Sequence, residues 1–217
     1  MHSIEENFRF LRVRVQHEVA LPALVVVGAA LRGDGTTYVA CGLARAFAEA
    51  GHQTLLLDAN PRNSGIADEL GMTTISNAAK PDLIDRNLSV ASLFEREERV
   101  VADDELAEVV AGVRSHYAVT IVDAPVIPGS GAALQLGRAA DGVLVAVRLG
   151  RRPCAADHEM KLLLQPGGLL GNKAISGVVT TRAAKRRSPR PSTATASVPP
   201  LADLLGSFVA RVQTTTR

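Results

Sequence analysis

The chain has 217 residues, of which 47% are hydrophobic, and its formal net charge is only +2. This composition suits one α/β domain, and the small charge gives no strong indication of nucleic-acid binding. With no Trp and only two Tyr, the chain also lacks the aromatic residues of a base-stacking surface.

The sequence predicts a chain that stays in the cytoplasm. No apolar run reaches the length needed to span a bilayer, and the first residues do not follow a signal-peptide pattern. Cys41 and Cys154 have neither a metal-ligand spacing nor a disulfide framework, so we interpret them as buried or half-buried thiols.

The first predicted element is an amphipathic helix over residues 4–18. Ile4, Phe8, Leu11 and Val15 recur at helical spacing and form an apolar stripe. Charged residues lie beside this stripe at intervals of one turn, and such residues can form local ion pairs on a helix surface; they are Glu6, Arg9 and Arg12.

Residues 24–60 contain the most informative pattern in the chain, and the interpretation of the other elements depends on it. A β-branched strand at 24–27 leads into a loop of small residues at 28–35 and a helix at 37–50, which ends at Gly51. A second apolar strand follows at 53–57. Strand, glycine loop, helix and strand form a βαβ unit of the phosphate-binding kind, in which backbone N–H groups and a helix N-terminus attract phosphate oxygens.

The glycine loop departs from the pattern of a working phosphate-binding loop at one position. Such a loop has Lys after its last glycine, to reach the β- and γ-phosphates, and then Ser or Thr for Mg²⁺. Here Thr37 keeps the hydroxyl but Thr36 occupies the lysine position. Arg32 lies in the same loop and could supply a positive charge, although its planar guanidinium cannot enter from the same angle as Lys. The loop reads Gly33-Asp34-Gly35-Thr36-Thr37.

The rest of the chain alternates helices and strands, which predicts a doubly wound, mostly parallel sheet flanked by helices. Ligands in such sheets bind beyond the carboxyl ends of the strands, so we expect Asp58 and Asp123, each at a strand end, to face the glycine loop. Residues 72–86 are polar and loop-like. The expected elements are a helix at 64–70, a strand at 88–93, a helix at 103–116, a strand at 118–122, a helix at 132–139, a strand at 142–147, a helix at 153–164 and a strand at 175–179.

The composition changes at Arg182. Residues 182–200 are first basic and then rich in Pro, Ser and Thr, as in a disordered linker. Within the final segment, residues 201–212 have apolar residues at helical spacing. Three interpretations stay open for this segment: contact with anionic lipid, packing on the chain's own sheet, and binding to a partner.

Several motifs, in this order and spacing, resemble those of bacterial tyrosine kinases of the capsular-exopolysaccharide type, within the wider MinD/ParA group of deviant P-loop ATPases. GDGTT resembles that family's loop GEGKS, LLLDANPR at 55–62 resembles its Walker A′ motif LLIDADLR, and VTIVDAPV at 119–126 resembles its Walker B motif VIIDTPPV. The charged row in the first helix resembles the family's ExxRxxR oligomerisation motif. The resemblance runs over roughly residues 4–181.

The resemblance implies ATP and Mg²⁺ as cofactors and a site for both. Residues from Arg32 to Thr37 (Arg32, Gly33, Asp34, Gly35, Thr36 and Thr37) would surround the nucleotide. Asp58 and Asp123 would be the catalytic carboxylates, and both would share Mg²⁺ with Thr37. The implied domain plan is an oligomerisation helix at 1–20, a P-loop NTPase-like domain at 21–181, a linker at 182–200 and a C-terminal amphipathic segment at 201–217.

The resemblance also implies partners. These are further copies of the chain, bound through Glu6, Arg9 and Arg12, and a membrane-anchored activator protein. The C-terminal tail is a candidate for peripheral contact with the membrane. The implied process is exopolysaccharide synthesis or export.

Three departures from the family pattern argue against catalysis. Thr36 replaces the loop lysine, Asn60 replaces the second carboxylate of the A′ motif, and the tail lacks the acceptor tyrosine cluster. Loss of a transition-state cation typically costs a factor of about a thousand or more in phosphoryl transfer. We therefore expect a pseudokinase that acts as a scaffold or regulator and binds ATP–Mg²⁺ weakly or not at all.

Two alternatives stay open. The first is an active kinase or ATPase with a non-standard loop, in which Arg32 replaces the lysine. The second is a ParA-like positioning protein that binds DNA or membrane through the basic run at 182–190.

Overall fold

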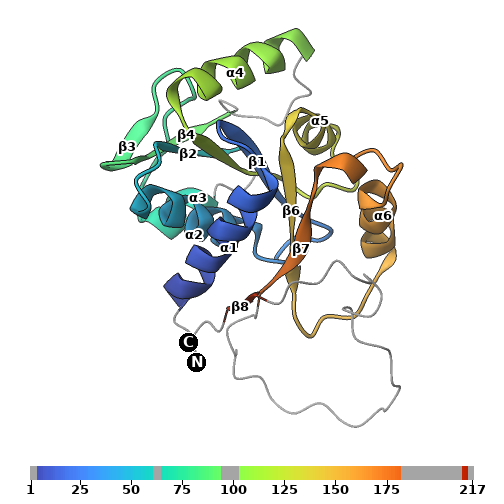
Figure 1. The fold of residues 1–217 in the computed structure, drawn as a ribbon. Helices are drawn as coiled ribbons and strands as arrows, with labels where there is room; N and C mark the ends of the chain where they lie inside the picture. Colours follow the sequence, from blue (N-terminus) through green and yellow to red (C-terminus); the bar gives the residue numbers. More distant parts are fainter. Residues whose placement is uncertain (1–3, 61–64, 94–102, 182–211, 215–217) are drawn as a thin grey trace.

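The structure, a computed structural model, describes residues 4–60, 65–93, 103–181 and 212–214 (Figure 1). The elements in chain order are α1 (Ile4–Glu18), β1 (Ala23–Ala29), α2 (Thr36–Glu49), β2 (Thr54–Asp58), α3 (Gly65–Leu70), β3 (Asp82–Asp85), β4 (Leu88–Ser92), α4 (Asp103–His116), β5 (Val119–Asp123), α5 (Gly131–Ala139), β6 (Gly142–Arg148), α6 (Ala155–Leu164), the 3-10 helix η1 (Gly171–Lys173), β7 (Ala174–Thr181) and β8 (Val212–Thr214).

The described strands form one sheet in the order β3-β4-β2-β5-β1-β6-β7-β8. Every pairing is parallel except that between β3 and β4. The predicted doubly wound, mostly parallel α/β fold is confirmed. β1, which leads into the glycine loop, lies between β5 and β6 in the middle of the sheet and is buried along its whole length.

Helices cover both faces of the sheet, as Figure 1 shows, with α1, α2 and α3 on one face and α4, α5 and α6 on the other. Alternate residues of each strand supply the two cores, because successive side chains of a strand point to opposite faces. In β1, Val25 and Val27 pack toward α1 and α2, whereas Leu24 and Val26 pack toward α5.

Two predictions from the sequence need correction. Residues 72–86 are not all loop, because β3 (Asp82–Asp85) adds an antiparallel strand at one edge of the sheet. At the other edge β8 pairs in parallel with β7, so Val212 lies in a strand and not at the end of a helix. The remainder of the predicted C-terminal helix and the whole basic linker lie outside the described residues.

Helix α1 docks on α2 by means of a glycine. Phe8 is buried, and its ring meets the edge of the Tyr38 ring, with 5.5 Å between the two centroids. A Cβ atom built on Gly42 of α2 would lie only 2.2 Å from the Phe8 ring. The absence of a side chain at Gly42 therefore lets the α1 helix approach α2 closely.

Gly42→Ala should displace Phe8 and destabilise the fold by about 1–3 kcal/mol, the usual effect of overpacking a core. Gly112→Ala in α4 is the matched control, because a Cβ atom there meets nothing within 4 Å. The control should be neutral or stabilising, since Ala favours helix by up to about 1 kcal/mol over Gly. Urea unfolding of both variants decides the point, and equal stabilities would contradict the proposed packing.

Candidate functional site at the carboxyl edge of the sheet

The two predicted carboxylates meet at the carboxyl ends of neighbouring strands. β2 ends at Asp58 and β5 ends at Asp123, and these two residues are direct register partners. Adjacent strands are about 4.8 Å apart, and register partners in a parallel pair point to the same side. Asp58 is 3% exposed and Asp123 has no exposed surface, so two acidic groups lie side by side away from water.

Thr37, at the start of α2, connects this pair to the glycine loop. Its hydroxyl donates a hydrogen bond of 2.7 Å to Oδ2 of Asp123. Oδ1 of the same carboxyl group is buried and has no hydrogen-bond partner among the described residues. Burial raises the pKa of Asp123 to about 7, the hydroxyls of Thr37 and Thr36 oppose the shift, and Asp58 adds to it.

Glycines give the loop its shape. Gly33 has φ of 80° and Gly35, the N-cap of α2, has φ of 91°, both in the left-handed region that favours glycine. Gly35 leaves no side chain at the N-terminus of α2, so the first N–H groups of the helix stay open toward a ligand. A Cβ atom on Gly65 of α3 would lie 3.2 Å from the Thr37 hydroxyl, so α3 also approaches the loop closely.

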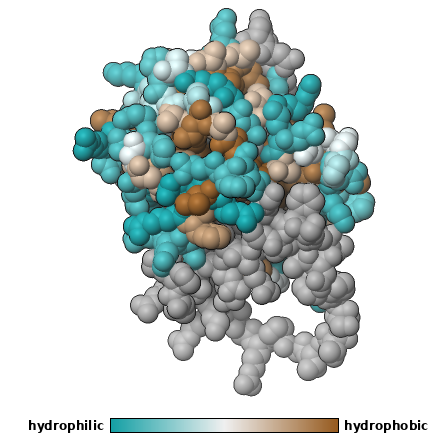
Figure 2. Space-filling model, viewed as in Figure 1, coloured by the Kyte–Doolittle hydropathy of each residue, from teal (hydrophilic) through white to brown (hydrophobic). Residues whose placement is uncertain are grey.

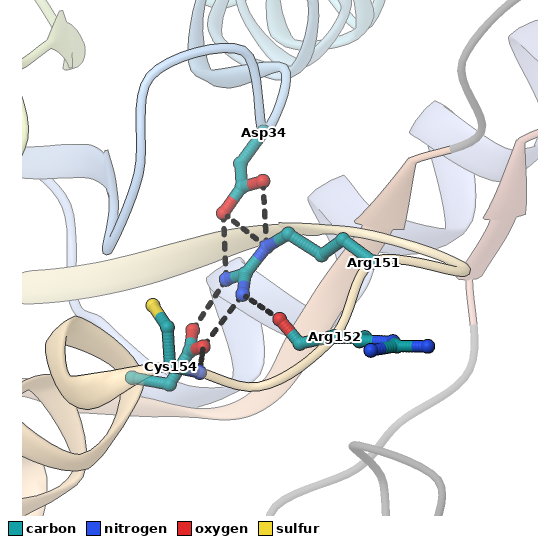
Figure 3. Close-up of polar contacts among 5 residues, drawn as sticks. Asp34, Arg151, Arg152 and Cys154 are labelled. Atoms are coloured by element: carbon teal, nitrogen blue, oxygen red, sulfur yellow. Dashed lines mark hydrogen bonds and ion pairs between the residues drawn. The ribbon is translucent and has the colours of Figure 1, made fainter. Parts of the chain in front are cut away.

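Asp34, the acidic residue between these glycines, is buried in an ion cluster. Arg151, from the loop between β6 and α6, donates to it through Nε, at 2.9 Å from Oδ1, and through Nη2, at 2.8 Å from Oδ2. The same guanidinium donates to both carboxylate oxygens of Asp157 in the first turn of α6, through Nη1 at 2.5 Å and through Nη2. Figure 3 shows the Arg151 side chain extending across to Asp34.

This cluster acts as a brace on the glycine loop. The Asp34 side chain is fully buried, and those of Arg151 and Asp157 are only 6% and 13% exposed. The cluster joins the loop to the N-terminus of α6, and Asp157 also accepts a hydrogen bond of 2.8 Å from the backbone N–H of Cys154. The pKa of Arg151 is raised, chiefly by its hydrogen bonds to Asp157, so the guanidinium stays charged.

The sequence did not predict the ion cluster of Asp34, Arg151 and Asp157. It assigned Asp34 to the nucleotide site. Its carboxylate is turned away from that site and holds Arg151, which lies 117 positions along the chain. The only local indication was an acidic residue between two glycines in an otherwise apolar and small-residue stretch. Nothing in such a pattern names the basic residue that pairs with it.

A cavity of about 840 Å³ lies above the glycine loop. Its walls come from the loop, from the start of α3 and from the segment between β5 and α5, where Ser130 accepts a hydrogen bond from the backbone N–H of Ala133 and caps α5. All of the predicted nucleotide contacts except Asp34 line this cavity. The predicted contacts that line it are Arg32, Gly33, Gly35, Thr36 and Thr37. Asn60 lines it too, while Asp58 and Asp123 lie behind the wall.

The charged side chains among the described lining residues are poorly suited to a polyphosphate. Arg32 is the basic side chain among the lining residues that the structure describes, and Asp68 and Glu69 are acidic. The protein also offers a divalent metal few ligands, since no three His, Cys, Asp or Glu side chains gather at one point in the described residues. Thr37, Asp58 and Asp123 are the described residues whose side-chain oxygens would be the ligands by the resemblance to the family.

Comparison with known proteins rests on solved structures, because no family model and no curated protein matches the chain. The kinase domain of Escherichia coli tyrosine kinase ETK is similar over 88% of this chain and 80% of its own, at 18% identity and a TM-score of 0.66. The chain has the fold of a bacterial tyrosine kinase domain. This confirms the fold that the motifs implied.

Two other kinds of protein share the fold. MinD from Aquifex aeolicus matches 75% of this chain and 70% of its own, at 18% identity and a TM-score of 0.55. Cobyrinic acid a,c-diamide synthase from Mycobacterium smegmatis, with a bound ATP analogue and magnesium, matches 73% and 72%, at 16% identity and a TM-score of 0.57. Similarity at these identities concerns the fold.

Arg151→Met should destabilise the protein by about 3–5 kcal/mol, because it leaves two buried carboxylates without their partner. Arg152→Met, at the exposed neighbouring residue, is the control and should change stability by less than about 0.5 kcal/mol. Combining Arg151→Met with Asp34→Asn and Asp157→Asn should recover part of the lost stability, because no buried carboxylate then lacks its partner. Denaturant unfolding measures all of these variants; an Arg151→Met variant as stable as its control would contradict the brace.

The raised pKa of Asp123 predicts that stability falls as pH rises from about 4 toward 8. The unfolded chain loses this proton near 3.8, whereas the folded protein keeps it until about 7. Between these values the folded state binds more protons, so raising the pH favours unfolding. Asp123→Asn should flatten this dependence, while Asp85→Asn, at an exposed position of β3, should leave it in place. Identical pH profiles for Asp123→Asn and the natural chain would exclude Asp123 as the source.

Proposed function

We propose that this chain is a non-catalytic relative of the bacterial tyrosine kinases, a pseudokinase that serves as a scaffold or regulator. It retains the architecture of a phosphate-binding domain, but Thr36 and Asn60 stand where the family has the lysine and the second carboxylate that help to hold and transfer a phosphoryl group. By the resemblance of its motifs, its process is exopolysaccharide synthesis or export.

The observation that supports this proposal is the chemistry of the cavity above the glycine loop. Thr36, where the family has Lys, lines the cavity, and so do two acidic residues of α3. ATP carries several negative charges, and backbone N–H groups and a helix dipole supply only partial positive charges to meet them. Among the described residues of the glycine loop, no lysine supplies the point charge that meets a polyphosphate in the family.

The residues of the site fit the two expected cofactors, Mg²⁺ and ATP, to different degrees. The buried, unpartnered Oδ1 of Asp123 suits a positively charged ligand, and Thr37 and Asp58 offer further oxygen atoms beside it. Among the described lining residues, the triphosphate of ATP would meet the acidic Asp68 and Glu69 and one arginine, Arg32. These residues would hold a metal better than they would hold the nucleotide that normally accompanies it.

Arg32 supports a second candidate function, that of an active ATPase with a non-standard loop. It is exposed and lines the cavity, so it can approach a ligand there. Its planar guanidinium is not equivalent to the compact ammonium group that Thr36→Lys would introduce within the loop. The ParA-like alternative depends on a basic run that lies outside the described residues.

The natural chain should bind ATP–Mg²⁺ weakly or not at all, and Thr36→Lys with Asn60→Asp should restore measurable binding. The lysine supplies the missing cation, and the aspartate returns a carboxylate to the cavity wall close to Thr37. The two changes act on the same phosphates, so either alone can fail.

Calorimetric titration with ATP at fixed Mg²⁺ compares the two proteins. Thr73→Lys with Asn77→Asp, at exposed positions on the surface, is the control for the added charges and should not bind. Tight binding by the natural chain would refute the pseudokinase proposal and favour the ATPase with Arg32. No gain in the double variant would mean that the loop has lost its phosphate-binding shape as well as its lysine.

We further propose that the chain self-associates through α1. Arg9 is 57% exposed and makes a pair of 3.5 Å with Glu49 of α2, a contact weak enough to be exchanged for one with a partner. Arg12 donates to Gln16, and its Nε is buried without a partner among the described residues. Phe10 and Val13 are 56% and 54% exposed, and Figure 2 shows hydrophobic atoms over α1 among hydrophilic ones.

Replacing Arg9 and Arg12 with Glu should dissociate an assembly that forms through α1, because like charges would then face each other. Lys80→Glu with Arg86→Glu makes the same change in charge at exposed residues near β3 and is the control. Sedimentation of the natural chain and both variants at high concentration provides the measurement, with the membrane-anchored activator added once it is known. A natural chain that stays monomeric under these conditions would rule out the proposal.

A further inference from the structure

A groove of about 460 Å³ lies between α4 and α5, on the face of the sheet opposite to α1 and α2 (Figure 1). The two helices turn other side chains toward the sheet, among them Val113 of α4 and Leu136 of α5, both of which are buried. The groove is therefore an outer surface of this helical layer and not a gap in the core.

The walls of the groove are apolar and consist largely of small side chains. Ala107 and Ala111 lie one turn apart on α4 and are exposed, Val110 between them is half-buried, and Ala139 lines the groove from α5. The distance at which two helices pack depends on the side chains at their contact, so small residues let another helix approach closely. The groove can thus receive the bulky apolar side chains of a third helix.

The charged residues that line the groove are basic. They are Arg114 and Arg138, in the last turns of α4 and α5, and no acidic residue is among the lining residues that the structure describes. Arg114 donates to the carboxylate of Asp141 and to the carbonyl oxygen of Pro22, so its charge is balanced. Arg138 is exposed and makes no hydrogen bond or ion pair within the described part of the chain. The groove therefore presents one available positive charge at the end of an apolar surface.

We propose that the groove between α4 and α5 is a docking site for a partner protein that presents an amphipathic helix with acidic residues beside its apolar face. Apolar side chains of that helix fill the groove against Val110 and the exposed alanines, and one of its carboxylates pairs with Arg138. This is the helix-in-groove mode of recognition, in which apolar anchors recur at intervals of three and four residues.

The shape of the groove favours a helix over a lipid chain. An alkyl chain is stabilised by the apolar surface that it removes from water, and it gains most in an enclosed cavity. Here Ala107 and Ala111 are exposed, so a single alkyl chain would stay partly in contact with water. A helix is broad enough to cover both alanines and still bring a carboxylate to Arg138.

The groove is separate from the glycine loop. Arg114 connects Pro22, just before β1, to Asp141, just before β6, so the basic end of the groove lies at the amino edge of the sheet. The glycine loop follows the other end of β1, at the carboxyl edge. The docking site is thus independent of ATP binding, and the inference goes beyond the pseudokinase proposal without depending on it.

The test uses the full chain and a labelled synthetic peptide of about 18 residues, long enough to form a helix in solution. The peptide has Leu along one face and Glu along the other, and a twin peptide has Lys in place of each Glu. Fluorescence anisotropy at low ionic strength measures both, because salt screens surface ion pairs. The acidic peptide should bind saturably and about tenfold more tightly than its twin.

Two variants assign the binding to the groove. Arg138→Glu should weaken binding of the acidic peptide about tenfold and strengthen binding of the basic twin, because an attractive pair becomes a repulsive one. Ala111→Trp should block the groove to both peptides. Arg86→Glu near β3 and Ala155→Trp in α6 make the same changes at exposed positions and should keep the natural affinity. Melting temperatures confirm that all four variants are folded.

A benzophenone group on the apolar face of the peptide locates the bound helix, and it should crosslink to residues 106–114 or 135–139. The proposal is overturned if the acidic peptide does not bind, if Arg138→Glu leaves its affinity unchanged, or if the crosslinks lie outside the groove. Dodecanoate below its micelle concentration is the probe for a lipid. Binding of dodecanoate that depends on Arg138, without binding of the peptide, would overturn the proposal in favour of an anionic lipid.

These outcomes are distinguishable from those of the ATP titration. Failure of the acidic peptide to bind would leave the pseudokinase proposal in place. Tight ATP binding by the natural chain would refute the pseudokinase and leave the docking site in place.

Discussion

The candidate site depends on one constraint, a carboxyl group that is buried at the centre of the sheet. Asp123 follows four apolar or small residues of β5 and has no access to water, so its charge must be balanced by a neighbour or by a proton. Thr37 provides one hydrogen bond, which fixes the first turn of α2 against the end of β5. The position of the glycine loop follows, because the loop must join the end of β1 to that helix.

A second constraint acts on the loop from the opposite side. Arg151 binds Asp34 with two hydrogen-bonding nitrogen atoms and binds Asp157 with two, so the loop is joined to α6 through a nearly water-free ion cluster. Buried ion pairs add little net stability, but removing one member is costly. In a loop whose lysine is absent, such a brace can keep the glycines in place without help from a bound phosphate.

If the chain is the pseudokinase that we propose, the two constraints together would explain how it keeps the architecture of the fold without its chemistry. Strand ends, glycine loop and first helical turn are held by contacts within the chain, so none of them requires a nucleotide in order to form. Two residues that line the cavity differ from the family's motifs: Thr36 in the loop and Asn60 at the cavity wall. The fold can then act as a surface for partners.

Local patterns in the sequence predicted most of the fold and part of the site. α1 and α4 have the predicted bounds because their apolar residues repeat with helical period, and Asp58 and Asp123 meet because the ends of parallel strands lie at one edge. β3 escaped prediction because Asp82–Asp85 is short and mostly exposed, so it carries no apolar pattern. The contact of Asp34 with Arg151 depends on the tertiary fold, and no local pattern specifies it.

The most direct test of the account is a measurement of ATP turnover and autophosphorylation by the natural chain, with Thr37→Ala and Asp123→Asn variants measured beside it. If the site has lost its chemistry, the natural chain with Mg²⁺ will release no more phosphate than these variants and will not label itself. Turnover by the natural chain that disappears in both variants would contradict the account, because it would show that the glycine loop and the strand-end carboxylates still act on a nucleotide.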